Sequence, residues 1–156
     1  MPYPGAEQIV NDLGGGDLER KQIREEFSRY EDWRDVPREL LQREQDALPM
    51  FEPQGFRFYL PAYMLFSVED YEGADIIPEC IVGLLTLPDE GTEFYEFIRE
   101  RLVLFSEEER KVILHFLEYL ELSHAEDFTD ICVGGWCTNT PKRAIESWRR
   151  LATGEI

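Results

Sequence analysis

The sequence has little cysteine and histidine, which limits the metal and nucleophilic chemistry that it can support. Cys80, Cys132, Cys137, His115 and His124 are the only such residues among 156. An odd, sparse set of cysteines is no disulfide framework and is typical of a reducing cytosol. The last four could supply zinc ligands, but they lack the two short-spaced hooks of a structural zinc site. We therefore expect no metal and no cofactor, although the sequence leaves binding by these four open.

Long apolar runs and catalytic motifs are also missing. The apolar runs are broken by Pro, Arg or Glu well short of the roughly 18 residues that a membrane span requires. The first residues lack the basic and apolar regions of a signal peptide, so we expect a soluble, cytoplasmic protein that does not bind membranes. There is no Gly-x-Ser-x-Gly, His-Glu-x-x-His or Walker motif. Glu121-x-x-His124 is only half of what a di-iron bundle needs. A non-enzymatic role is favoured, with Cys–His catalysis left open.

Basic residues are scarce: 16 stand against 33 acidic ones, for a net charge of -17. Such a field repels nucleic acid and attracts basic partners. From Arg57 to Arg99 there is no intervening lysine or arginine. We expect the acidic residues of this interval to form a surface that binds a basic protein, and the alternative is acidity that serves solubility alone. The predicted partner-binding residues are Glu69, Asp70, Glu72, Asp75, Glu79, Asp89, Glu90, Glu93 and Glu96.

What the chain does have is apolar content, 43% of residues, with 13% aromatic. These values indicate a folded globule of single-domain size. The segment 51–66 is the richest part, and its large residues recur at helical spacings of three and four. Pro53 is placed to begin a helix, whereas Pro61 removes an interior hydrogen bond and predicts a kink or a restart. We expect this segment to be the central core helix.

Capping signals and apolar periodicity predict further helices on both sides of that segment. Asp17 is a good N-cap for a helix to about Tyr30, and Ser106 with Glu109 forms a capping box before the best-defined helix. Segment 131–137 reads as a short extended piece or a turn. The expected fold is an all-α, compact single-domain bundle of about six to eight helices with a proline-kinked central helix. Residues 1–16 are expected to be a flexible N-terminal lead, with Gly14-Gly15-Gly16 as a joint, and residues 17–156 the single all-helical domain.

Arg57 is a charge inside the aromatic segment, and it has three interpretations. It pairs with a carboxylate or snorkels to the surface, or it lies beside Tyr59 and Tyr63 in a pocket for a small ligand or substrate. Aromatic residues at helical spacing are more often core than binding platform. The ion-pair role is therefore favoured, and the pocket at Arg57, Tyr59 and Tyr63 is kept as the alternative.

The run Phe56-Arg-Phe-Tyr-Leu-Pro-Ala-Tyr-Met64, followed by Phe105-Ser-Glu-Glu-Glu109 and by Phe116-Leu-Glu-Tyr-Leu120, resembles a bacterial family known only as a domain of unknown function. Trp33 fits the upstream tryptophan of that pattern. The resemblance covers roughly residues 20–122 and leaves Trp148 outside. It implies an uncharacterised domain with no catalytic residues to carry over.

These observations predict a non-enzymatic, acidic interaction protein. Its most concrete form is an immunity-type or inhibitor protein that binds a basic partner such as a toxin domain through 69–96. The alternatives are a small-ligand-binding protein or enzyme with the Arg57 pocket, and an orphan globular domain of unknown function. The sequence leaves the oligomeric state and the identity of the partner undetermined.

Overall fold

The computed structural model describes residues 1–11, 17–133 and 136–156, without the side chains of 132–138. The predicted glycine joint at 14–16 lies outside these residues. The chain divides into two compact units, Met1–Pro78 and Glu79–Ile156, which are described separately below. Whether residues 17–156 fold as a single domain stays a prediction.

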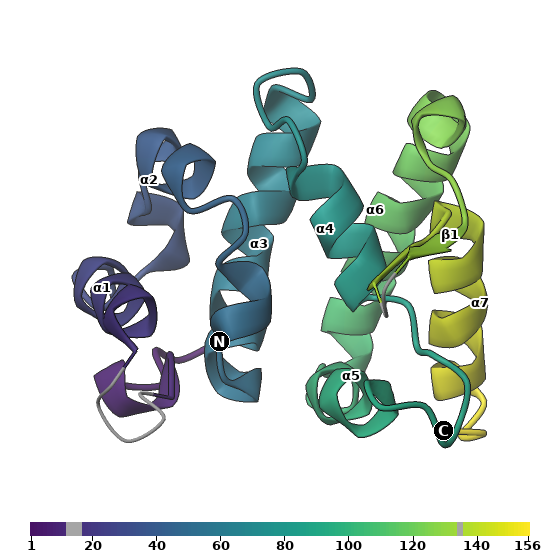
Figure 1. The fold of residues 1–156 in the computed structure, drawn as a ribbon, viewed down its shortest axis with the longest axis horizontal. Helices are drawn as coiled ribbons and strands as arrows, with labels where there is room; N and C mark the ends of the chain where they lie inside the picture. Colours follow the sequence, from purple (N-terminus) through teal and green to yellow (C-terminus); the bar gives the residue numbers. More distant parts are fainter. Residues whose placement is uncertain (12–16, 134–135) are drawn as a thin grey trace. The chain divides into compact units, whose positions relative to one another are not determined.

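Helices dominate the described part of the chain, as predicted (Figure 1). The all-α class is confirmed, and one short β-hairpin is added to it. The α-helices are α1 (Leu18–Phe27), α2 (Arg38–Arg43), α3 (Pro53–Glu69), α4 (Ile77–Leu84), α5 (Tyr95–Leu102), α6 (Glu107–His124) and α7 (Pro141–Ala152), with strands β1 (Ile131–Val133) and β2 (Trp136–Thr138). No helix in the described ranges is both long and apolar enough to cross a membrane.

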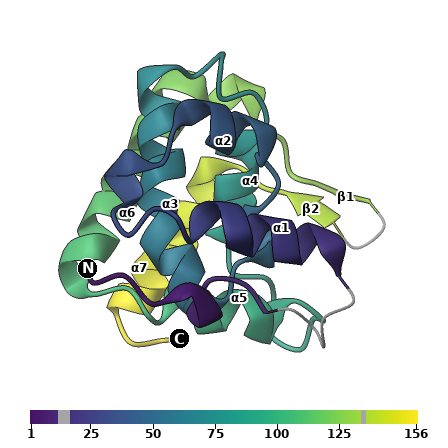
Figure 2. The ribbon, with the colours of Figure 1, turned by 90° about the vertical axis from the view of Figure 1, so that its left-hand side faces the viewer.

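Unit 1 is built around α3, the predicted core helix. It begins at Pro53 and continues through Pro61 to Glu69 as one element, so the restart that Pro61 allowed does not occur. Phe56, Tyr59 and Tyr63 are fully buried on it. In Figures 1 and 2, α1 lies across α3 at a steep angle. This crossing places the buried Phe27 ring, at the end of α1, 5.1 Å from the Tyr59 ring.

The described N-terminal residues, 1–11, are part of unit 1, and whether residues 1–16 form a flexible lead stays a prediction. Ile9 and Val10 are fully buried. Val10 pairs with Phe51 in an isolated antiparallel bridge, and the Glu52 amide donates to the Ile9 carbonyl at 2.7 Å. A Cβ at Gly55 would lie 2.5 Å from that same carbonyl oxygen, so only glycine permits this approach. Residues 1–11 are thus held by burial and by backbone hydrogen bonds.

The sequence predicts the start of a helix correctly where a nearby side chain caps it. The Asp17 carboxylate accepts a hydrogen bond from the Arg20 amide at 3.2 Å and caps α1. The capping box of α6 is present in both directions: Ser106 Oγ accepts from the Glu109 amide, and Glu109 accepts from the Ser106 amide. Both caps were predicted from the sequence and are confirmed.

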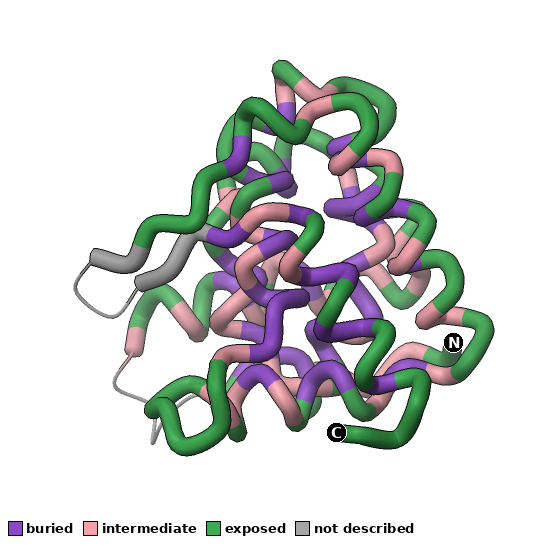
Figure 3. Tube along the Cα trace, turned by 90° about the vertical axis from the view of Figure 1, so that its right-hand side faces the viewer, coloured by how far each residue is buried: buried purple, intermediate pink, exposed green. Residues whose placement is uncertain are grey.

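Unit 2 centres on α6 and α7, which pack along each other. The buried Trp148 of α7 donates its indole Nε1–H to the Leu85 carbonyl at 3.0 Å. One residue earlier, Ser147 Oγ accepts from the Leu87 amide at 3.0 Å. The chain after α4 is therefore tied to α7. Figure 3, viewed from the side of α7, shows buried and exposed stretches alternating along the trace.

The hairpin occupies the segment for which the sequence allowed an extended piece or a turn. Strands β1 and β2 pair antiparallel, with Cys132 opposite Cys137 in the register. Asp130 precedes β1, and its carboxylate accepts from the Thr140 amide at 2.9 Å, which joins the two ends of the hairpin.

Candidate functional site

All nine predicted partner-binding carboxylates are exposed, but they fall in both units. Glu69, Asp70, Glu72 and Asp75 belong to unit 1, and the other five belong to unit 2. The structure therefore provides two separate acidic stretches to be considered, one in each unit.

In unit 1, two of the four carboxylates already have structural roles. Glu69, the last residue of α3, forms an ion pair with Arg38, whose guanidinium also lies 5.6 Å from the Phe66 ring centroid. Asp70 accepts from the Gly73 amide at 3.0 Å and shapes the turn that follows α3. Glu69 thus connects α2 to α3, and Asp70 stabilises the turn after α3. They are thus only partly available to a partner.

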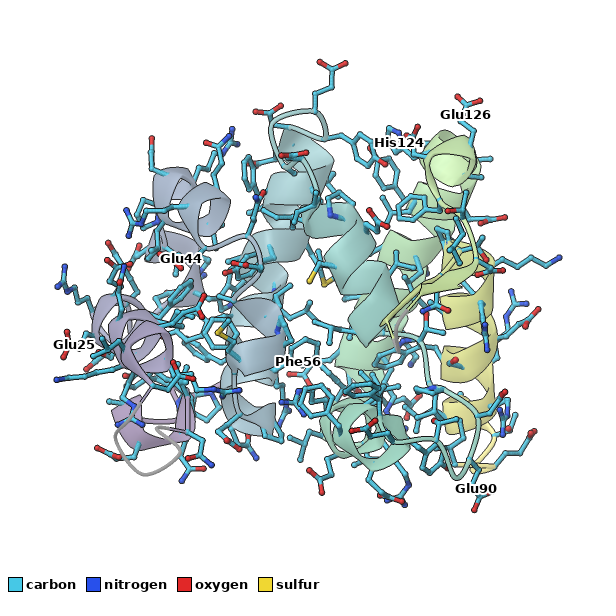
Figure 4. The ribbon with its side chains drawn as sticks, in the orientation of Figure 1. Glu25, Glu44, Phe56, Glu90, His124 and Glu126 are labelled. Atoms are coloured by element: carbon cyan, nitrogen blue, oxygen red, sulfur yellow. The ribbon has the colours of Figure 1, made fainter. Side chains whose placement is uncertain are left out.

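The stretch Asp89–Glu96 in unit 2, here called the acidic segment, is different. Asp89, Glu90 and Glu93 form no ion pair or side-chain hydrogen bond with any residue that the structure describes. Glu96 pairs only loosely with Arg99, at 3.7 Å. Figure 4 shows the Glu90 side chain extending away from the ribbon. Unpaired carboxylates are fully available to a cationic partner.

The backbone of the acidic segment is ordered by turns up to Phe94, and its last two residues begin α5. The Asp89 carbonyl accepts from both the amide and the hydroxyl of Thr92, at 3.1 and 2.8 Å. Gly91 has φ 86°, a conformation that favours glycine. Because the Leu87 amide is bonded to Ser147, the segment starts from a fixed point on α7. Its charges are therefore presented by a defined loop.

An exposed aromatic ring lies within this loop, and the sequence prediction missed it. Phe94 is the residue before α5, which begins at Tyr95, and its side chain is 44% exposed. Its ring meets Phe97 edge-on at 6.5 Å. Exposed aromatic residues are enriched at protein interfaces. No sequence signal distinguished Phe94 from the buried phenylalanines.

The alternative site at Arg57, Tyr59 and Tyr63 is not one pocket. Tyr59 and Tyr63 are fully buried, and their hydroxyls donate to backbone carbonyls: Tyr59 to Phe27 at 2.8 Å and Tyr63 to Glu44 at 2.8 Å. Burial raises the pKa of Tyr59 well above its usual value. Both tyrosines are core residues whose polar ends are satisfied.

Arg57 does line a cavity, but with other residues. This hollow of about 170 Å³ is bounded by Arg57, Gln54, Gln8 and the first four residues of the chain. Pockets that hold drug-sized ligands are about 300–1,000 Å³. The cavity is too small for such a ligand, so the acidic segment is the better supported candidate.

The residues considered for metal binding do not gather in the described part of the chain. His115 is exposed on α6. His124 ends that helix, with Nε2 3.3 Å from the Tyr119 hydroxyl and Nδ1 3.8 Å from Asp127. The side chains of Cys132 and Cys137 lie outside the described residues. Among those that are described, no group of three or more His, Cys, Asp or Glu side chains could hold a metal ion.

Comparison with protein families gives a model, for a family of unknown function, that matches residues 14–150. The match extends beyond the expected range of 20–122 at both ends and includes Trp148, which the sequence resemblance had left outside. No curated protein and no solved structure matches the chain. The comparisons therefore support the predicted uncharacterised domain and give no activity.

Proposed function

The chain belongs to the family of unknown function DUF6714, and we propose that it is a non-enzymatic interaction protein whose acidic segment binds a basic partner protein. An immunity-type or inhibitor role against a basic toxin domain is the most concrete form of this proposal. The observation that carries it is the set of exposed carboxylates of Asp89, Glu90 and Glu93, which have no ion-pair partner among the described residues.

The acidic segment can increase the rate of association with a partner and can also contribute an apolar contact to the complex. Exposed charges of one sign steer an oppositely charged partner and raise the association rate, an effect that salt weakens. Charge alone gives modest affinity, because exposed ion pairs contribute only about 0–1 kcal/mol each. The half-exposed Phe94 adds an apolar contact within the acidic segment. A partner would therefore combine cations with an apolar surface.

The test compares two triple variants that change the net charge of the protein by the same amount, one within the acidic segment and one outside it. Asp89→Lys, Glu90→Lys and Glu93→Lys together should weaken binding of a decalysine peptide at least tenfold, measured by calorimetry in 50 mM salt. The matched control replaces Glu31, Glu100 and Glu126 by lysine; these residues are exposed and lie outside the acidic segment. Equal weakening by both triple variants would refute the assignment, since binding would then follow net charge and not this loop.

A further inference from the structure

The exposed face of α7 is basic, in a protein that is otherwise strongly acidic. Four of the eight basic residues of unit 2 lie on this one helix. Three of them are exposed and Arg143 is half-exposed. Lys142, Arg143, Arg149 and Arg150 are here called the α7 cationic face.

The helix that carries this face is held firmly from behind. Ala144, Ile145, Trp148 and Leu151 are buried on the opposite side of α7. Trp148 and Ser147 are hydrogen-bonded to the backbone of Leu85 and Leu87, as described above. The backbone under the cations is therefore fixed before any partner arrives. A preorganised surface loses less conformational entropy on binding.

The charges of the face are only partly neutralised within the chain. Arg149 approaches Glu118 at 3.9 Å and Arg150 approaches Glu155 at 3.8 Å, both near the limit of an ion pair. Lys142 and Arg143 form no ion pair with any residue in the described ranges. Exposed pairs of this kind are weak and easily exchanged. The face therefore keeps a positive potential that a partner's carboxylates can satisfy.

The spacing of the cations defines what fits. Lys142 and Arg149 are seven residues apart, as are Arg143 and Arg150, which is about 10 Å along a helix. The face thus presents two cation pairs separated by two helical turns, with Glu146 between them. Carboxylates two turns apart on a partner helix have the same separation.

We propose that the α7 cationic face docks a short acidic segment of a partner protein, with carboxylates about two helical turns apart. This surface is distinct from the acidic segment, and the proposal does not depend on the function proposed above. A short segment contacts the cations alone. A nucleic-acid duplex or an anionic membrane would extend past the face onto a protein of net charge -17 and would be repelled.

The full-length protein can be titrated with a helical peptide that carries glutamates at positions i, i+1, i+7 and i+8, in 50 mM salt, with anisotropy as the readout. Lys142→Glu with Arg143→Glu, which breaks no ion pair, should weaken binding at least tenfold, and so should Arg149→Glu with Arg150→Glu. The control, Arg99→Glu with Lys111→Glu, makes the same charge change elsewhere in unit 2 and should weaken binding less than threefold. Melting curves show that each variant is folded.

Four results would overturn the proposal. They are no measurable peptide binding, equal weakening by the control, tighter binding of a DNA duplex or of anionic phosphatidylserine vesicles than of the peptide, and self-association that Arg149→Glu with Arg150→Glu abolishes. The last result would assign the face to a second copy of the chain. Because decalysine binding tests the acidic segment separately, failure of one proposal leaves the other intact.

Discussion

At the scale of single residues, the clearest feature is the use of tyrosine hydroxyls to hold distant backbone. Tyr59 reaches two carbonyls, those of Phe27 at 2.8 Å and Tyr30 at 3.1 Å, where α1 ends and the chain turns. The Phe27 carbonyl also accepts from the Tyr30 amide at 3.0 Å, so the Tyr59 hydroxyl is one of two donors to it. A hydrogen bond of this kind contributes about 0.5–1.5 kcal/mol to stability. The aromatic segment thus stabilises the fold through the hydrogen bonds of its hydroxyl groups as well as through the packing of its rings.

Tyr59→Phe should lower the free energy of unfolding by about 0.5–1.5 kcal/mol, because it removes the hydroxyl and leaves the ring and the second donor to the Phe27 carbonyl in place. The measurement is urea denaturation at pH 8. Tyr95→Phe is the matched control, since Tyr95 is only half-buried and its hydroxyl forms no hydrogen bond with any residue that the structure describes. Equal stability of the Tyr59→Phe variant and the parent would contradict this role.

The same residue gives a pH dependence. Burial raises the pKa of Tyr59 in the folded state, so above the unfolded value of about 10 the unfolded chain releases a proton that the folded chain keeps. Stability from this group is therefore complete below pH 10 and is lost as the pH rises above it. The parent should lose more stability between pH 9 and pH 11 than Tyr59→Phe does.

At the scale of elements, the helices whose ends were predictable are those capped by nearby side chains. Asp17 and Ser106 act within three residues, so their effect can be read from the sequence. The exposure of Phe94 could not be predicted in this way. It depends on the path of the chain after α4, which is fixed by the hydrogen bond between the Leu87 amide and Ser147 of α7. Tyr59 and Tyr63 were grouped with Arg57 as a pocket because their carbonyl partners are far away in sequence. Arg101 of α5 is also buried, with its guanidinium carbon 3.6 Å from the centroid of the Phe97 ring, a contact that no local sequence signal indicates.

The capping box of α6 gives a direct prediction. Ser106→Ala should destabilise the protein by about 1 kcal/mol, because the Glu109 amide loses its acceptor at the first turn. Thermal denaturation followed by circular dichroism measures the change. Ser123→Ala, an exposed serine in the last turn of the same helix, should have little effect. If the two variants melt alike, the box does not stabilise α6.

At the scale of the whole molecule, the net charge of -17 is shared almost equally by the two units. The acidic interval between Arg57 and Arg99 is thus a local depletion of cations and not the sole source of acidity. Repulsion among so many like charges opposes the compact state, and it is screened by salt.

Stability should therefore increase with ionic strength. The melting temperature is expected to rise by several degrees between 10 and 500 mM sodium chloride, as screening weakens the repulsion. Sodium sulfate at equal ionic strength is the comparison, since it also strengthens apolar burial. A melting temperature that falls with added sodium chloride would mean that the surface ion pairs outweigh the repulsion.

The contact of Ile9 with Glu52 and Gly55 also affects how the chain is made. Residues 9 and 10 leave the ribosome before the strand bridge and the helix start that bury them, which lie more than forty residues later in the chain. Contacts between such distant residues form slowly, because a long loop must close first. The segment around Ile9 is therefore among the last parts of unit 1 to reach its place, and its apolar residues stay exposed during translation until α3 has emerged.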